Sequence, residues 1–152
     1  IMNGGFQGHE VAAFDYHYET HSTDSKGHRQ THPHHFSFFI LALDTHFPEL
    51  TIAKESFLSK IAQAVGFDDI DFESHEFSRR FAVRSKDKKF AYDFCNAQMI
   101  DYLLGHTDIN IEVDQNSLAL GFNRCLKAEE IEFHLKQLIE IRKRMPNYLF
   151  DE

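Results

Sequence analysis

Histidine is the residue type in this chain whose number and spacing most strongly suggest chemistry. Eleven histidines occur among 152 residues, and eight of them lie within the first 46. Neutral imidazole is a common ligand of Zn²⁺ and Ni²⁺, and a neighbouring carboxylate can complete such a site. The N-terminal third of the chain is therefore the first candidate region for metal binding.

Two strands that flank the polar segment 22–27 would bring several of these histidines together. If the strands pair about the centre of that segment, His17 lies opposite His34 and Glu19 lies opposite His32. Opposed residues share one face of a sheet, with Cβ atoms about 5 Å apart. This register predicts a Zn²⁺ or Ni²⁺ site made of His17, Glu19, His32 and His34. A slip of one residue would divide the four between two faces and leave an exposed polar surface instead.

A second group of chemically active side chains is acidic. Asp69, Asp71 and Glu73 alternate with Ile70 and Phe72. In a strand this alternation places the three carboxylates on one side, where they could bind Mg²⁺ or Ca²⁺ or supply an acid–base pair to a hydrolase. The spacing matches no calcium-binding loop. A solvated strand face is the alternative interpretation.

Other motifs of catalytic chemistry are missing from the sequence. It contains no phosphate-binding glycine loop, no Gly-x-Ser-x-Gly and no His-Glu-x-x-His. The two cysteines, Cys95 and Cys125, are too few for a disulfide scaffold. Both follow or precede apolar residues, so we expect buried, reduced thiols.

Composition places the chain among globular domains. Hydrophobic residues make up 42% and charged residues 26%, and no apolar stretch approaches the ~20 residues of a membrane-spanning helix. The formal net charge of −8 argues against nucleic acid as a partner. The length predicts a single soluble domain over residues 1–152. Because Ile1 precedes Met2 and no signal sequence follows, we expect a fragment that lacks an N-terminal segment.

The first third of the chain has the pattern of antiparallel strands. Gln7-Gly8 predicts a tight turn after a short strand, and residues 11–20 alternate between apolar and polar side chains. The apolar run 36–43 predicts a central strand, and residues 50–53 predict a short edge strand after Pro48. A further hairpin is expected over 109–122.

Helices are expected mainly in the second half. The predicted helices are 57–65 with Gly66 as cap, one turn after Ser74, 88–94, a segment that begins at Asn96, and 128–145. Together the elements predict an α+β fold: a mostly antiparallel sheet of hairpins, about three to four helices, and a long C-terminal helix packed on the sheet. The predicted core joins the central strand to the last helix through Phe36, Phe38, Ile40, Leu43, Ile131, Leu135 and Leu138.

Several phrases of the sequence are similar to those of a known family. They are Val11–Tyr16, His28–His32, Asp69–Ser74 with His75–Arg80 after it, Lys89–Asp93 and Met145–Phe150. In these stretches the chain resembles an uncharacterised bacterial family of unknown function that often follows one or two N-terminal transmembrane helices. The resemblance implies a bacterial domain at the cytoplasmic face of the inner membrane, tethered through a segment outside this chain. It carries over no catalytic residue.

These observations favour a non-enzymatic domain that binds a protein partner near the bacterial inner membrane. One alternative is a metal-binding or metal-sensing domain that uses the N-terminal histidines. A second alternative is a hydrolase that uses the carboxylates of Asp69–Glu73. A pocket with converging polar groups would distinguish the last from the others.

Overall fold

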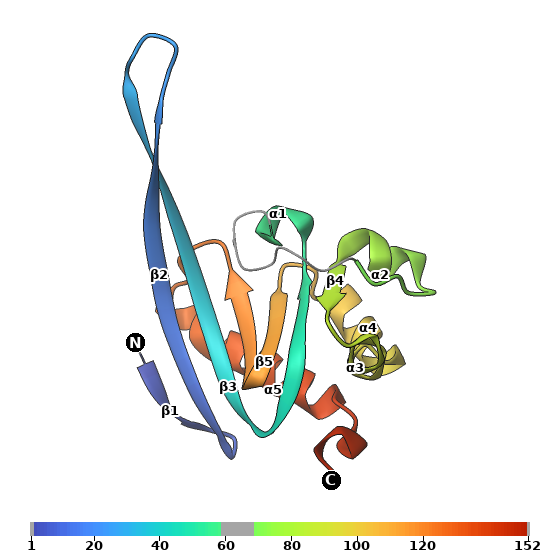
Figure 1. The fold of residues 1–152 in the computed structure, drawn as a ribbon. Coiled ribbons are helices and arrows are strands. Elements are labelled where there is room, and N and C mark those ends of the chain that lie inside the picture. Colours follow the sequence, from blue (N-terminus) through green and yellow to red (C-terminus); the bar gives the residue numbers. More distant parts are fainter. Residues whose placement is uncertain (1, 59–68, 152) are drawn as a thin grey trace.

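The computed structural model describes residues 2–58 and 69–151 and shows an antiparallel sheet with a long helix packed on one face (Figure 1). This confirms the predicted α+β class and the position of the C-terminal helix. The sheet has five strands, whose pairing is antiparallel throughout. Their bounds are β1 Met2–Phe6, β2 His9–Thr23, β3 Arg29–Ala53, β4 Ala82–Ser85 and β5 Asn110–Phe122.

The described residues contain five α-helices, where three to four were predicted. Each of the five overlaps a segment that the sequence predicts to be helical. Two 3₁₀ turns, Ala128–Glu130 and Asn147–Phe150, flank the last helix. The helix bounds are α1 Glu55–Leu58, α2 His75–Arg80, α3 Lys88–Phe94, α4 Ala97–Leu104 and α5 Ile131–Arg144.

Strands β3 and β5 both fold back on themselves, and β5 lies between the two halves of β3 (Figure 1). Phe38 in the first half of β3 pairs with Gly121, and Ile52 in the second half pairs with Ile111. The segment 50–53 pairs with β4 as well as with β5. The prediction that it forms an edge strand is therefore wrong, because its second neighbour comes from far along the chain.

The core lies between the sheet and α5. On this side of the sheet, called the α5 face, Leu41 pairs with Leu118 and both are fully buried, as is Leu138 of α5. Phe36, Phe38 and Ile40 point to the opposite side, called the α1 face because Phe57 of α1 packs there. The prediction that these three pack beneath α5 is wrong. An unbroken apolar run carries no alternation from which the inward face could be identified. Phe36, Leu43, Leu135 and Leu138 are buried as predicted, whereas Phe38, Ile40 and Ile131 are half-buried.

The predicted N-caps Ser74 and Asn96 are confirmed, and Asp87 caps α3 in the same way. Oxygen atoms of Ser74, Asp87 and Asn96 accept hydrogen bonds from the backbone N–H groups three residues ahead, at 3.0–3.3 Å. Asn96 also donates through Nδ2 to the carbonyl of Arg144 at 2.9 Å. This bond joins the start of α4 to the end of α5.

Two other predicted elements, a helix and a strand, are not seen as predicted in the described residues. The helix expected over 57–65, with its cap at Gly66, lies outside the described residues except for Phe57 and Leu58, which belong to α1. The strand expected around Ile70 and Phe72 is reduced to an isolated bridge between Asp69 and Arg84. The Phe72 ring packs instead against two rings of the adjacent helices, those of Phe77 and Tyr92.

Candidate functional site

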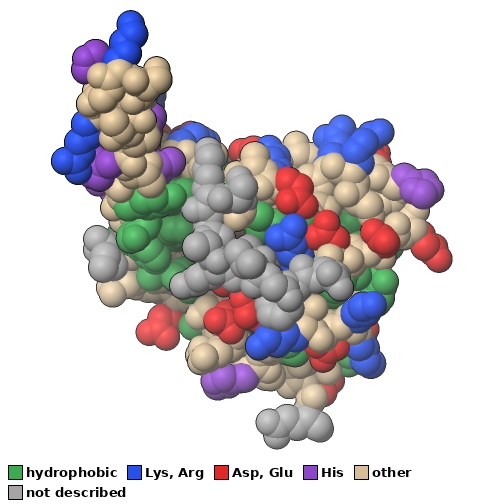
Figure 2. All heavy atoms as spheres, turned by 45° about the horizontal axis from the view of Figure 1, so that its top comes forward, with side chains coloured by type: hydrophobic (Ala, Val, Ile, Leu, Met, Phe, Trp, Pro, Cys, Tyr) green, Lys and Arg blue, Asp and Glu red, His purple; other side chains and the backbone are tan. Residues whose placement is uncertain are grey.

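The paired strands β2 and β3 extend past the rest of the sheet as a two-stranded arm, here defined as residues 16–36 (Figure 1). β1 pairs with β2 only as far as Ala13, and β5 pairs with β3 only from Ser37 onward. Within the described residues, neither outer edge of the arm is therefore paired with another strand. Figure 2 shows basic and histidine side chains near the end of the arm and a hydrophobic patch at its base.

The loop at the tip of the arm sets the register of its strands. Asp24 N–H donates to the carbonyl of His28 at 2.9 Å, and Gly27 N–H donates to the carbonyl of Asp24 at 3.1 Å. Gly27 has φ +83°, which a glycine adopts without strain. The Asp24 carboxylate accepts from the backbone N–H groups of Lys26 and His28. These bonds form a three-residue hairpin loop, which has an odd length.

This loop corrects the predicted histidine register by one residue. His17 lies opposite His35, not His34, and Glu19 lies opposite Pro33, not His32. His17 and Glu19 therefore share one face of the arm, while His32 and His34 lie on the other. The four predicted ligands are not brought together.

Each face of the arm has its own polar contacts. On the first, the rings of His17 and His35 stack with centroids 4.6 Å apart, and Glu19 Oε1 lies 3.9 Å from His17 Nε2. On the second, His34 Nε2 lies 3.2 Å from Thr20 Oγ1. Among residues 2–58 and 69–151, no three His, Cys, Asp or Glu side chains are arranged to hold a metal ion.

Aromatic rings form a continuous row on the α1 face, from the arm into the body. Neighbouring ring centroids lie 4.6–6.1 Å apart, which is within the range of favourable aromatic contacts. Tyr16 is 52% exposed, whereas Phe36 is buried. We call this row the aromatic stripe; it consists of Phe14, Tyr16, Tyr18, His34, Phe36 and Phe38.

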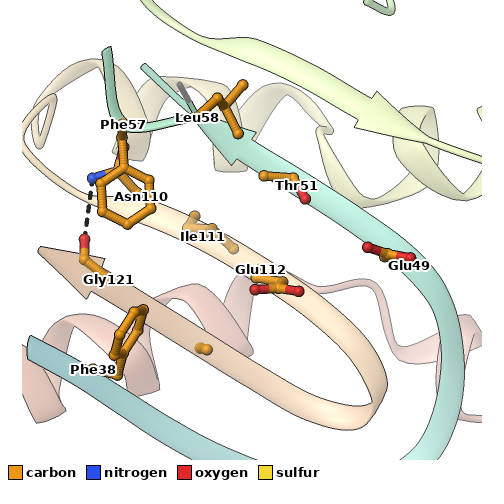
Figure 3. A pocket seen from close by; sticks show the side chains of 10 residues that line it. Phe38, Glu49, Thr51, Phe57, Leu58, Asn110, Ile111, Glu112 and Gly121 are labelled. Carbon is orange, nitrogen blue, oxygen red and sulfur yellow. Dashed lines mark hydrogen bonds between the residues drawn. The ribbon is translucent and has the colours of Figure 1, made fainter. Parts of the chain in front are cut away.

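A small pocket adjoins the body end of the aromatic stripe on the α1 face (Figure 3). Its volume of about 30 Å³ holds one or two water-sized groups. The rings of Phe38 and Phe57 lie at one end of the pocket, and the carboxylates of Glu49 and Glu112 lie at the other. The remaining lining residues are Thr51, Leu58, Asn110, Ile111, Ala119 and Gly121.

Two polar groups of the pocket differ in their bonding. Asn110 is buried and satisfied, since its Oδ1 accepts from Lys54 N–H at 3.1 Å and its Nδ2 donates to the carbonyl of Gly121 at 3.1 Å. The pKa of Glu112 is raised from its usual value by burial and by the negative charges of Glu49 and Asp114. Sequence reasoning missed this site because its residues come from strands that are far apart in the chain.

The carboxylates predicted as a hydrolase site lie elsewhere. Asp69 Oδ1 accepts a 2.7 Å hydrogen bond from Arg84 Nε, and Arg84 also contacts Glu55 at 3.3 Å. Asp71 and Glu73 are exposed. The arrangement is a surface ion-pair cluster in which Asp69 alone of the three contacts a described cation.

The two cysteines differ in their exposure to solvent. Cys95 is buried as predicted, and burial raises the pKa of its thiol. Cys125 is exposed, which corrects the prediction that both thiols are buried. The adjacent Leu126 is only half-buried, so the apolar sequence context was a poor guide here.

Comparisons with known proteins return no relative. No family model, no curated protein and no solved structure matches the chain. Among the described residues, no helix is long and apolar enough to cross a membrane.

Proposed function

We propose that this domain binds a protein partner, and that the arm and its aromatic stripe form the contact surface. The observation that carries the proposal is a two-stranded arm with no strand paired to either outer edge among the described residues. An isolated two-stranded ribbon is only marginally stable in water. Free strand edges can add a strand from another chain, and exposed aromatic rings are enriched at protein interfaces.

A photo-crosslinking residue in the arm tests the proposal. Benzoylphenylalanine in place of Tyr16, which is 52% exposed, should give a discrete crosslinked product in cells of the source organism. The matched control is Phe133 on α5, which is 56% exposed but lies outside the arm. A product from Tyr16 alone supports the proposal. An equal product from Phe133, or none from Tyr16, contradicts it.

The proposed place of action is the cytoplasmic face of a bacterial inner membrane. Its support is the sequence resemblance described above, which implies a membrane tether outside this chain. Fractionation of the source cells, with the protein detected by antibody, should find it in the membrane pellet and release it after proteolysis of a tether. Recovery entirely in the soluble fraction would contradict this placement.

Metal binding is the second candidate function, and the opposed pair His17 and His35 favours it. Opposed histidines have Cβ atoms about 5 Å apart, so both imidazoles can reach one Zn²⁺ or Ni²⁺ ion. With two histidines the site would be weak. Binding should fall below pH ~6, where the imidazoles take up protons.

Calorimetric titration of the metal-stripped protein with Zn²⁺ tests this candidate. His35→Ala should abolish the binding heat, while His34→Ala, one residue away on the opposite face, should leave it unchanged. Equal heats for the two variants would show that the pair is not the site.

A further inference from the structure

The pocket on the α1 face has two carboxylates that no described cation neutralises. Thr51 pairs with Glu112, and Glu49 precedes Thr51 by two residues, so the two glutamates are diagonal neighbours on one face. Both point toward the same end of the pocket (Figure 3). No salt bridge between described residues involves either of them.

Some carboxylates elsewhere in the body have cationic partners, which Glu49 and Glu112 lack among the described residues. Arg144 contacts Glu140 at 2.7 Å, and Lys89 contacts Asp93 at 2.8 Å. Glu112 is half-buried, and two carboxylates that share a site repel each other. A cation placed between Glu49 and Glu112 would remove that repulsion.

The rest of the pocket is suited to an alkyl chain. The rings of Phe38 and Phe57 form one end, with Leu58, Ile111 and Ala119 among the other lining residues. The pocket exists because position 121 has no side chain: a Cβ on Gly121 would lie 2.8 Å from Cζ of Phe57. A ligand matched to both ends is a cation carried on a narrow aliphatic stem.

We propose that the pocket binds the lysine side chain of a partner segment, with its methylenes against Phe57 and its ammonium between Glu49 and Glu112. This inference rests on the proposed function, because the lysine belongs to the partner that the arm engages. A volume of about 30 Å³ leaves room for a small group, such as the compact ammonium at the end of a lysine stem. Among the described residues, no third His, Cys, Asp or Glu side chain joins the two glutamates in a group that could hold a metal ion.

The pH dependence follows from the groups that face the ammonium. These are Glu49 of β3 and Glu112 and Asp114 of β5; Arg84 of β4 lies opposite Thr51 on the same face, where it is paired with Glu55 and Asp69. Because the pKa of Glu112 is raised, binding should weaken as the pH falls through that raised pKa and Glu112 becomes neutral. It should persist at higher pH until the amine itself loses its proton, near pH 10.

An NMR titration of the whole chain with n-butylammonium as probe tests the inference without the partner. Backbone amide signals of Thr51, Glu112 and Ala119 should shift with 1:1 saturation, with a dissociation constant on the order of millimolar for so small a ligand. Glu112→Gln should weaken binding roughly tenfold or more, since a charge-assisted bond is lost. Glu10→Gln removes one exposed charge elsewhere in the sheet and should have no effect.

Two control ligands distinguish a lysine side chain from other possible occupants of the pocket. Equal binding of 1-pentanol would show an apolar notch without cation selectivity, and saturable Ca²⁺ binding that displaces the amine would show a metal site. Either result, or the absence of shifts, overturns the inference. The crosslinking result at Tyr16 does not depend on the pocket, so failure of the pocket is distinguishable from failure of the arm.

Discussion

Gly121→Ala is the substitution that most directly tests how the pocket is built. The new Cβ would lie 2.8 Å from Cζ of Phe57 and 3.1 Å from Cε1 of Phe38. Both contacts are shorter than ordinary van der Waals distances. Since Phe57 is buried, its ring has little room to withdraw and would be pushed into the pocket.

The expected loss of stability follows from two opposing effects. Replacing glycine by alanine at a compatible backbone stabilises a protein by about 0.4–1 kcal/mol, because the unfolded chain loses freedom. Overpacking of a well-packed site costs about 1–3 kcal/mol. The net destabilisation should be about 1–2 kcal/mol, or roughly 3–6 °C in Tm for a chain of this size.

Urea denaturation measures this loss against a matched glycine. In Gly105→Ala the nearest atom is the carbonyl oxygen of Tyr102 at 3.5 Å, an ordinary contact, so that variant should be at least as stable as the wild type. Combining Gly121→Ala with Phe57→Leu should recover about 1 kcal/mol, because the clashing ring is removed. A Gly121→Ala protein as stable as the wild type would refute the reasoning.

Three further predictions concern the core, the pocket and the thiols. Leu41→Ala should lower the free energy of unfolding by about 3–5 kcal/mol, because Leu41 is fully buried beneath α5. Ile40→Ala should lower it by only about 1–2 kcal/mol, because Ile40 is half-buried on the other face. Urea denaturation measures both, and equal losses would contradict the assigned faces. The raised pKa of Glu112 means that the folded state binds more protons than the unfolded state between pH ~4.5 and that pKa, so wild-type stability rises as the pH falls through this window. Glu112→Gln should therefore be more stable at pH 7 and gain less on acidification, as denaturant midpoints at pH 7 and 5 would show. Ellman's reagent should label Cys125 rapidly in the native protein and Cys95 only after denaturation; two fast thiols would contradict the burial of Cys95.

The elements predicted best are those set by neighbouring residues. Ser74, Asn96 and the Gln7-Gly8 turn act through bonds or dihedral angles within a few residues, and each lies where it was expected. The long periodic stripe of α5 was equally clear, with Leu138 fully buried. Such features need no knowledge of the rest of the fold.

The features predicted wrongly depend on pairing between distant segments. The assignment of 50–53 as an edge strand failed because β5, much later in the chain, pairs with it. The pocket was missed for the same reason, since Glu49 and Glu112 become neighbours only through that pairing. Neither glutamate belongs to a motif, and each alternates with apolar residues in the way that any strand does.

The register of the two histidine-bearing strands was also predicted wrongly, but in this case the sequence did contain a local signal for the correct register. Asp24 and Gly27 are the first and last residues of a hydrogen-bonded turn that ends in a left-handed glycine, which is typical of three-residue hairpin loops. An odd loop requires His17 to face His35 and places His34 on the α1 face, stacked on Tyr18. Side chains alternate along a strand, so a loop longer by one residue would move the whole second strand of the arm to the opposite face. The four hydrogen bonds around Asp24 therefore determine which histidines lie opposite each other and which rings of the arm belong to the aromatic stripe.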